Sequence, residues 1–242
     1  IGAYCFIDEC HHVLRQRGEL AIAEDDGLEL LKFLPAELQN SVVEAAVCGN
    51  LGQVLTTRGD LDRAHAMLQH ALTLNQQLGR AEGVAGCQVG IGNLHLVQGE
   101  YDVAEFMYHE ALSATTDEAD TGRIIECLTN LGILRMKMMD LQEADATFTK
   151  VLQLSEQHGQ PEHLARVHMH LGTLEMKRDN FIRAEQLLRL SLEINESLDR
   201  KEGTAISSHQ LGLLHMRCDK LDDARQAIEQ SLSMNTAIGR RE

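Results

Sequence analysis

The chain has 242 residues, no Trp, five Phe and three Tyr, and its two prolines are Pro35 and Pro161. Since good helix formers dominate and proline is scarce, we expect an all-α fold. The formal net charge of −15 disfavours binding to nucleic acid and to anionic membranes, and no apolar run is long enough to predict a transmembrane helix.

The cysteines predict the cellular compartment, and the first residue bears on the extent of the chain. The six cysteines occur singly, without a Cys-x-x-Cys pair, which is typical of proteins in a reducing compartment. The sequence shows no signal peptide. We therefore expect a cytoplasmic protein. Because the first residue is Ile rather than Met, we also expect the sequence to be a piece of a longer chain.

Residues 1–44 predict a degenerate helix pair. Gly18-Glu19-Leu20 mirrors Gly59-Asp60-Leu61 of the next unit, at a spacing of forty-one residues. His11 stands where the later units carry a glycine. The second helix of this pair is expected to end near Pro35, because the residue before a proline is disfavoured in a helix.

Beyond residue 44 the sequence repeats every forty residues, in the units 45–84, 85–124, 125–164, 165–204 and 205–242. Each unit carries a glycine that follows Leu or Ile, and an alanine twelve residues after that glycine. The glycines are Gly52, Gly92, Gly132, Gly172 and Gly212, and the alanines are Ala64, Ala104, Ala144, Ala184 and Ala224. Five units in one register predict a tandem array, and we expect a single domain over residues 1–242.

Each unit has two stretches with the apolar spacing of a helix, such as 45–57 and 61–78. The turn between them is rich in Gly, Asp and Asn, and Asp140 with Glu143 has the spacing of a capping box. Glycine inside a helix costs about 1 kcal/mol relative to Ala, so the glycine column indicates a close approach of two helices. Glycines also suit the ends of three second helices, at Gly79, Gly159 and Gly239.

This pattern of Leu-Gly, Gly-Asp and Ala resembles the tetratricopeptide repeat over nearly the whole chain. The long period, with Gly79-Arg80-Ala81-Glu82-Gly83 before the next helix, is similar to the repeats of kinesin light chains, Leu-Gly-Asn-rich adaptors and bacterial regulators. The resemblance implies a right-handed superhelical α-solenoid of about six antiparallel helix pairs. It also implies a scaffold for protein–protein interactions that binds a peptide or helix of a partner in its concave groove.

The resemblance further implies that the first helix of each pair lines this groove. The residues expected there are Asn50, Gln53, Asn93, Asn130, Met136, Lys137, Arg166, Met169, His170, Thr173, Met176, Lys177, His209, Gln210, Met216 and Arg217. In related adaptors, an asparagine at the position of Asn50 and Asn130 binds the backbone of an extended peptide. In this chain, His170 and Gln210 occupy the same position in the later units.

The units from about 123 to 217 are expected to contribute most to binding. They combine methionines, which adapt their shape to different partners, with a cationic ladder formed by Lys137, Lys177 and Arg217. We expect this half to bind a protein or peptide that is acidic and partly apolar. The alternative is that the methionines fill the core and that the basic side chains are solvated.

Two other functions remain open, and two classes of site are disfavoured. The chain could be a regulatory or sensor segment of a larger signalling or transcription protein, or a structural scaffold that self-associates through the ends of the array. The twelve histidines form no ligand set with zinc spacing, so we expect no metal and no cofactor. Because no nucleophile elbow, phosphate loop or metalloprotease helix is present, we expect no catalytic residues and no enzyme activity.

Overall fold

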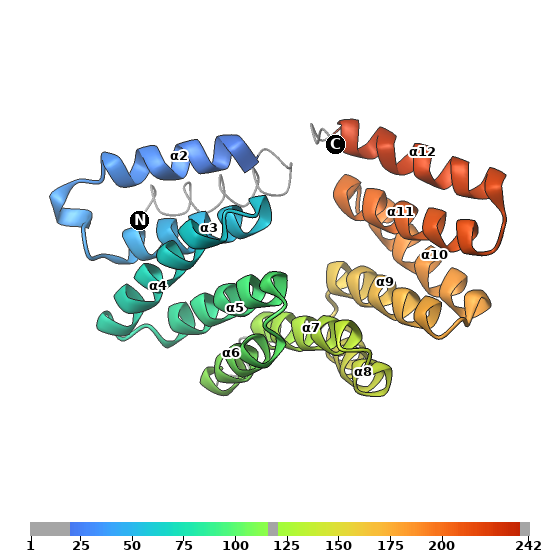
Figure 1. The fold of residues 1–242 in the computed structure, drawn as a ribbon, viewed down its shortest axis with the longest axis horizontal. Coiled ribbons are helices and arrows are strands. Elements are labelled where there is room, and N and C mark those ends of the chain that lie inside the picture. The colour runs from blue at the N-terminus through green and yellow to red at the C-terminus, as the bar shows by residue number, and fades with distance from the viewer. Residues whose placement is uncertain (1–19, 116–120, 238–242) are drawn as a thin grey trace. The chain divides into compact units, whose positions relative to one another are not determined.

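The structure is a computed structural model that describes residues 20–115 and 121–237, and every regular element in these ranges is a helix (Figure 1). The helices are α2 (Leu20–Lys32), the 3₁₀ helix η1 (Ala36–Leu38), α3 (Val42–Arg58), α4 (Leu61–Gln77), α5 (Ala81–Gln98), α6 (Tyr101–Ala114), α7 (Thr121–Lys137), α8 (Leu141–Gln157), α9 (Pro161–Lys177), α10 (Phe181–Ser197), α11 (Lys201–Arg217) and α12 (Leu221–Ala237). The expected all-α fold is confirmed. None of the helices in the described ranges is both long and apolar enough to cross a membrane.

Consecutive helices pack as the expected pairs, with α3 on α4, α5 on α6, α9 on α10 and α11 on α12. The first helices begin about one turn before the boundaries expected from the apolar pattern, as at Val42 and Lys201. In α11 the reason is that the first turn, Lys201-Glu202-Gly203, contains no large apolar side chain and so adds no apolar signal.

The N-terminal segment forms the expected second helix of a degenerate pair. α2 ends at Lys32, before Pro35, and packs on α3. The other features expected near the two ends lie outside the described residues: His11, Gly18 and the Gly239 cap.

The contacts divide the chain into two compact units, Ile1–Asn130 and Leu131–Glu242, hereafter the N-terminal unit and the C-terminal unit. The boundary falls inside α7, so this helix contributes residues to both units. The organisation of residues 1–242 as one array remains a prediction.

The turn after each first helix has the same left-handed backbone in all five pairs. It is found at Gly59 (φ 82°), Gly99 (φ 80°), Met139 (φ 63°), Asp179 (φ 61°) and Asp219 (φ 55°). The next N–H donates to a carbonyl five residues back, as from Asp60 to Leu55 at 3.0 Å, which is the bond of a Schellman cap. Glycine adopts this conformation without steric cost, whereas Met139 adopts it at a steric cost.

The predicted caps of the second helices are also present. Asp140 accepts a hydrogen bond from the backbone N–H of Glu143 at 3.3 Å, which is one half of the expected capping box. Gly79 and Gly159 have φ of 66° and 59°, as expected for residues that end a helix.

The glycine column brings the helices of each pair together around a large side chain. A Cβ added at Gly132 would lie 2.5 Å from Cε1 of Phe148, a fully buried ring on α8. The other glycines face the residue sixteen positions later in the same way, namely Leu68, Tyr108, Leu188 and Ile228. Any larger residue in the column would overlap this side chain, so the close approach predicted from the sequence is confirmed.

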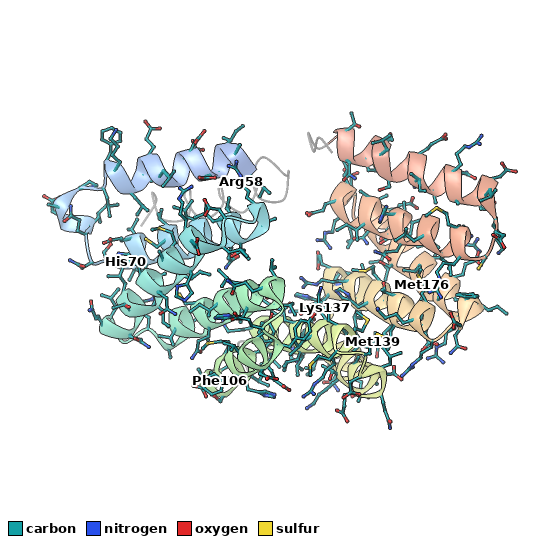
Figure 2. All side chains as sticks on the ribbon, viewed as in Figure 1. Arg58, His70, Phe106, Lys137, Met139 and Met176 are labelled. Carbon is teal, nitrogen blue, oxygen red and sulfur yellow. The ribbon has the colours of Figure 1, made fainter. Side chains whose placement is uncertain are left out.

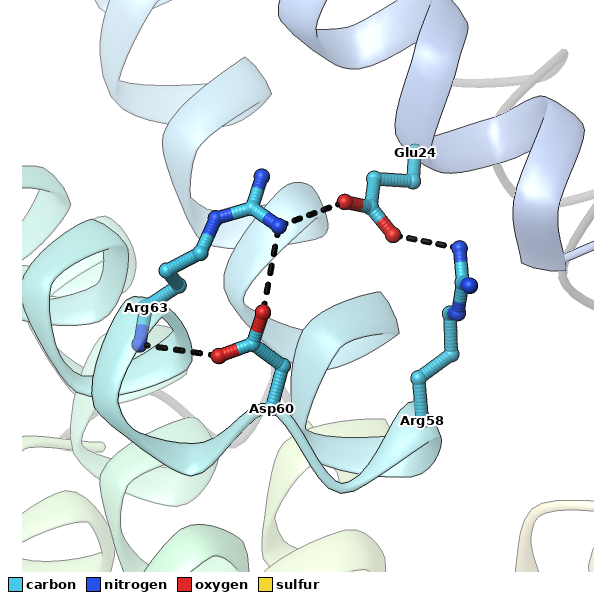
Figure 3. Close-up of polar contacts among 4 residues, drawn as sticks. All are labelled: Glu24, Arg58, Asp60 and Arg63. Atoms are coloured by element: carbon cyan, nitrogen blue, oxygen red, sulfur yellow. Dashed lines mark hydrogen bonds and ion pairs between the residues drawn. The ribbon is translucent and has the colours of Figure 1, made fainter.

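Charged side chains link neighbouring pairs in both units. In the N-terminal unit, Glu24 of α2 accepts hydrogen bonds from Arg58 at 2.5 Å and Arg63 at 2.7 Å (Figure 3). In the C-terminal unit, Arg178 donates to Asp145 at 3.0 Å. Because Arg178 lies three repeat lengths after Arg58, the same position of the turn is used in both units to hold neighbouring pairs together.

Candidate functional site: a pocket among the first helices

A pocket of about 230 Å³ lies among α3, α5 and the start of α7 in the N-terminal unit. Helix α3 forms one wall and the N-terminal part of α5 forms another, while Arg123 reaches in from α7. The lining residues are Ala45, Ala46, Gly49, Asn50, Gln53, Leu68, Asn75, Arg80, Glu82, Gly83, Gly86, Cys87 and Arg123. The pocket is thus built mainly from first helices, which are the helices expected to bind a partner.

The pocket is open because small residues occupy positions where other repeats carry large ones. Ala46 and Gly49 of α3 correspond, three repeat lengths later, to Arg166 and Met169 of α9. A Cβ added at Gly49 would meet a single neighbour, Cβ of Ala71, at 3.9 Å. Among the described residues, therefore, little fills the space beside Gly49, and this part of the pocket has room for a ligand.

The walls of the pocket carry amides and two guanidinium groups. Asn50 and Gln53 are half-buried on α3. Arg80, in the turn before α5, donates from Nη1 to Oδ1 of Asn75 at 3.4 Å. Arg123 is only 18 % exposed, and its Nη2 lies 3.7 Å from Oε1 of Glu82. Amides and guanidinium groups together suit the carbonyl and carboxylate oxygens of a peptide.

Cys87 forms part of the pocket wall, and its surroundings do not favour a reactive thiolate. Burial raises the pKa of this thiol, and the hydrogen bond from Asn75 and the cations Arg123 and Arg80 offset the effect only in part. The thiol therefore stays protonated near neutral pH, and a thiol is a much weaker nucleophile than a thiolate.

The structure brings some of the predicted groove residues of the N-terminal unit together. Asn50 and Gln53 line the pocket side by side on α3. Asn93 of α5 is half-buried and accepts a hydrogen bond from the hydroxyl of Tyr108 at 2.8 Å, so its side chain also supports the fold. Asn130 is half-buried on α7.

In the C-terminal unit, the predicted methionines and cations do not share one surface. Met136 and Met176 are each 6 % exposed and fill the core, whereas Lys137 and Lys177 are exposed. Figure 2 labels one residue of each kind, Met176 and Lys137. Met216 is 43 % exposed. The two buried methionines therefore belong to packing between helices, and we leave them out of the binding surface proposed below.

Arg217, the last residue of the predicted ladder, has a structural task. Its Nη1 donates to the backbone carbonyl of Met176 at 2.6 Å and its Nη2 to Oδ1 of Asp179 at 2.6 Å. The guanidinium also lies 5.1 Å from the ring centroid of Phe181. A cation at the C-terminal end of a helix is stabilising, so Arg217 of α11 caps α9 and joins the two pairs.

The remaining predicted residues lie on α9 and α11. The ring of His170 stacks on Phe148 at 5.3 Å between centroids, and burial together with the Arg166 cation lowers the pKa of His170 to about 4. Thr173 donates to the backbone carbonyl of Met169 at 3.0 Å. Arg166 and His209 are exposed, and Gln210 is half-buried.

Sequence reasoning did not assign Arg80, Arg123, Ala46 and Gly86 to the site. Comparing equivalent positions of the repeats by side-chain type finds asparagines and cations, but it does not find positions where a large side chain is absent. The available signal was the small size of Ala46, Gly49 and Gly86 compared with the residues three repeats later. Those residues are Arg166, Met169 and Ile206.

Comparisons with known proteins give the family. Models of the tetratricopeptide repeat match residues 41–117 and 163–237, which are more than half of the chain, and residues 125–158. Among curated proteins, none matches the sequence.

Several solved structures share the fold at low identity. The Rap protein complexed with competence and sporulation factor is 13 % identical with a TM-score of 0.76, and the match covers 98 % of this chain and 65 % of that protein. NprR in complex with its cognate peptide NprX is 13 % identical with a TM-score of 0.73, over 98 % of this chain and 70 % of NprR.

A further structure contains the nearly identical repeats of a putative kinesin light chain from Podosopora anserina. It is 15 % identical with a TM-score of 0.56, over 80 % of this chain and 96 % of that one. At such identities the structural likenesses establish the fold alone. Together with the matches to the family models and the five helix pairs, they lead to one conclusion: the chain belongs to the tetratricopeptide repeat family.

Proposed function

We propose that the chain is a scaffold for protein interactions that binds a peptide segment of a partner across its first helices. The α3–α5–α7 pocket is the anchoring point of this interaction. The observation that carries the proposal is this pocket of about 230 Å³, in which Asn50, Gln53 and two arginines surround a space left by small residues. A volume of this size suits a side chain or a short segment rather than a whole small molecule, since ligand pockets for small molecules usually exceed about 300 Å³.

Two structural neighbours support a peptide as the ligand. The Rap protein and NprR hold a competence and sporulation factor and a cognate peptide, respectively. A fold that presents neighbouring first helices suits an extended ligand, because each pair adds further contacts along the same surface.

The proposal includes binding without catalysis, in a reducing compartment such as the cytoplasm. Cys48, Cys87 and Cys127 are buried, and none of these three cysteines forms a disulfide. Burial raises the pKa of Cys48 to about 12, so this thiol is also protonated and unreactive. Buried cysteines that form no disulfide persist most readily where the environment is reducing.

A double substitution that fills the pocket tests the proposal. Ala46→Arg with Gly49→Met introduces the side chains that α9 carries at the corresponding positions, so the helix is expected to accept them. The matched control is Ala66→Arg, which adds the same charge at an exposed position of α4.

Peptides would be selected from a displayed random library against the wild-type protein and then tested on both variants. We expect the enriched peptides to bind the Ala66→Arg control as they bind wild type, and to lose at least about tenfold in affinity for the filled variant. Enriched peptides that bind the filled variant as tightly as wild type would contradict the pocket as the anchoring point.

A further inference from the structure

One face of α12, the last helix that the structure describes, is exposed where the same face of an earlier second helix is covered (Figure 1). Ile228 is 36 % exposed, whereas Leu188, forty residues before it, is fully buried. Leu221 and Leu232 are 70 % and 47 % exposed, although their counterparts in α10 are half-buried. These three residues of α12 lie on one side of the helix, because they are seven and four positions apart. Together they form an apolar surface, hereafter the α12 face.

The earlier pairs show what kind of element covers such a face. In the C-terminal unit, α11 packs on α10, and Leu211 of α11 lies in one buried cluster with Leu188. In the N-terminal unit, α5 packs on α4, and Leu94 of α5 lies in one buried cluster with Leu68. The covering element is each time the first helix of the next pair. Because the α12 face continues this repeated interface, the element that fits it is one further helix of the same kind.

An asparagine near the end of the second helix restricts which helix can pack there. Asn195 of α10 is 3 % exposed, and a Cβ added at Gly203 of α11 would overlap its side chain. Asn75 of α4 and Gly83 of α5 form the same pair, with Asn75 4 % exposed. In both units, the asparagine is therefore buried against a helix that carries glycine at the facing position.

The residues at these two positions change together along the chain. Thr115 and Ser155 occupy the position of Asn75 in the next two second helices, and Arg123 and His163 occupy the position of the glycine. A shorter side chain on the second helix thus accompanies a larger residue on the helix that follows. Since a close-packed interface offers a fixed volume, asparagine on the second helix predicts glycine on its partner.

α12 carries both polar groups with which α10 contacts α11. Ser231 corresponds to Ser191, whose hydroxyl lies 2.8 Å from the hydroxyl of Ser207 of α11. Asn235 corresponds to Asn195, whose Nδ2 donates to Oγ of Ser207 at 3.3 Å. Asn235 is only half-buried, so its amide remains accessible to a ligand.

We propose that the α12 face binds one amphipathic helix of a partner protein, and that this helix carries the motif Gly-x-x-x-Ser. The glycine of the motif lies against Asn235 and the serine pairs with Ser231, as Gly203 and Ser207 of α11 do on α10. The exposed leucines and Ile228 of the α12 face supply the apolar contacts. This inference goes beyond the proposed function, whose pocket belongs to the N-terminal unit.

A peptide with the sequence of α11, Lys201–Arg217, serves as the probe because it contains the motif and natively packs on the equivalent face of α10. It is titrated into the ¹⁵N-labelled full chain, and the backbone amide signals of α10 and α12 are followed. We expect saturable shifts at Ser231 and Asn235 of α12.

A single methyl group on the peptide tests the glycine. Alanine is a better helix former than glycine, so a Gly203→Ala peptide is more helical than the parent, yet its added Cβ meets Asn235. We expect it to bind the wild-type protein at least about tenfold more weakly than the parent peptide. Asn235→Ser shortens the facing side chain, and we expect this protein variant to bind the Gly203→Ala peptide within about threefold of the parent affinity. Misfolding cannot restore binding, which makes this combination the decisive one.

Variants of the apolar part of the face have a matched control. Leu232→Lys is expected to weaken binding of the parent peptide at least about tenfold, because a buried leucine contact is lost. Gln226→Lys adds the same charge at an exposed position of the same helix, outside the α12 face, and is expected to leave the affinity unchanged. Light scattering of the protein alone, over a series of concentrations, tests whether a second copy of the chain occupies the face instead. We expect a monomer throughout.

Several results would overturn the proposal. These are no saturable shift with the parent peptide, shifts confined to α10, where the peptide would displace α11, and undiminished binding of the Gly203→Ala peptide to wild type. Failure of Asn235→Ser to restore that binding, undiminished binding by Leu232→Lys, or a dimer that Leu232→Lys dissociates would also overturn it.

Discussion

Replacing Gly132 with alanine adds a single methyl group at a point where α7 and α8 approach closely. The added Cβ would lie 2.5 Å from Cε1, 2.7 Å from Cζ and 2.8 Å from Cδ1 of Phe148. The ring of Phe148 is fully buried and has His170 stacked on it, so it has no free space into which to retreat. The helices must separate or the ring must leave its rotamer.

The size of the effect follows from two opposing contributions. Alanine is about 1 kcal/mol more favourable than glycine within a helix. Overpacking of a tight core costs about 1–3 kcal/mol, and the three short contacts place this site at the upper end of that range. We therefore expect Gly132→Ala to lower the free energy of unfolding by about 2 kcal/mol.

Urea unfolding followed by circular dichroism at 222 nm measures this change, and Gly122 supplies the control. Gly122 lies in the same helix, but a Cβ added there meets nothing within 4 Å. Gly122→Ala is thus expected to leave stability unchanged or to raise it by up to about 1 kcal/mol. If Gly132→Ala is as stable as wild type, the close helix approach does not explain the glycine column.

Three further predictions concern the turns, the histidines of α9 and the N-terminal pair. Met139→Gly should raise the free energy of unfolding by about 1 kcal/mol, because Met139 has a left-handed φ of 63° and its side chain is 63 % exposed. Met138→Gly, at the neighbouring residue, should bring no such gain. A destabilised Met139→Gly would refute this prediction. The pKa of His170 is about 4 in the folded protein and about 6.5 in the unfolded chain, so its contribution to stability is complete above pH 6.5 and is lost as the pH falls towards 4, by about 1.4 kcal/mol per pH unit. In urea titrations across this pH range, the stability of His170→Gln should depend less steeply on pH than that of wild type. An unchanged slope would exclude His170 as the cause. Glu24→Gln should cost about 1 kcal/mol in thermal or urea unfolding, because Arg58 and Arg63 donate to different oxygens of Glu24 and an amide keeps only one oxygen and loses the negative charge. No loss of stability would show that the cluster is dispensable.

The helix pairs could be predicted from the sequence because each depends on local, repeated chemistry. The glycine column, the buried alanines and the turns with positive φ are each read from residue types at fixed positions. Even Met139, which does not suit a left-handed turn, adopts the conformation that Gly59 and Gly99 adopt. The neighbouring repeats set the backbone there, and they override the preference of a single residue.

The candidate site could be predicted only in part. Asn50 and Gln53 were assigned to one face of α3 from the repeat register, and both residues line the pocket. Met176 and Arg217 were expected to contact a partner, but one is buried in the core and the other caps α9. The position of a residue within the repeat specifies which face of a helix it occupies, whereas the burial of its side chain depends on neighbours from other repeats.

The pocket itself could not be found by looking for chemically active residues. It depends on what Ala46, Gly49 and Gly86 lack, and on Arg80 and Arg123 approaching from separate elements. Such a site is a property of three helices together, so it becomes visible only when their packing is known.

The central claim is that a peptide anchors among α3, α5 and the start of α7. The most direct test is to map, by ¹⁵N-resolved NMR, which backbone amides shift when a library-selected peptide is added to the wild-type protein. The account predicts that the largest saturable shifts occur at Gly49, Asn50, Gly83 and Gly86, and that the Ala46→Arg/Gly49→Met variant abolishes them at the positions it retains. Saturable shifts confined to the second helices, with these pocket amides unmoved, would contradict it.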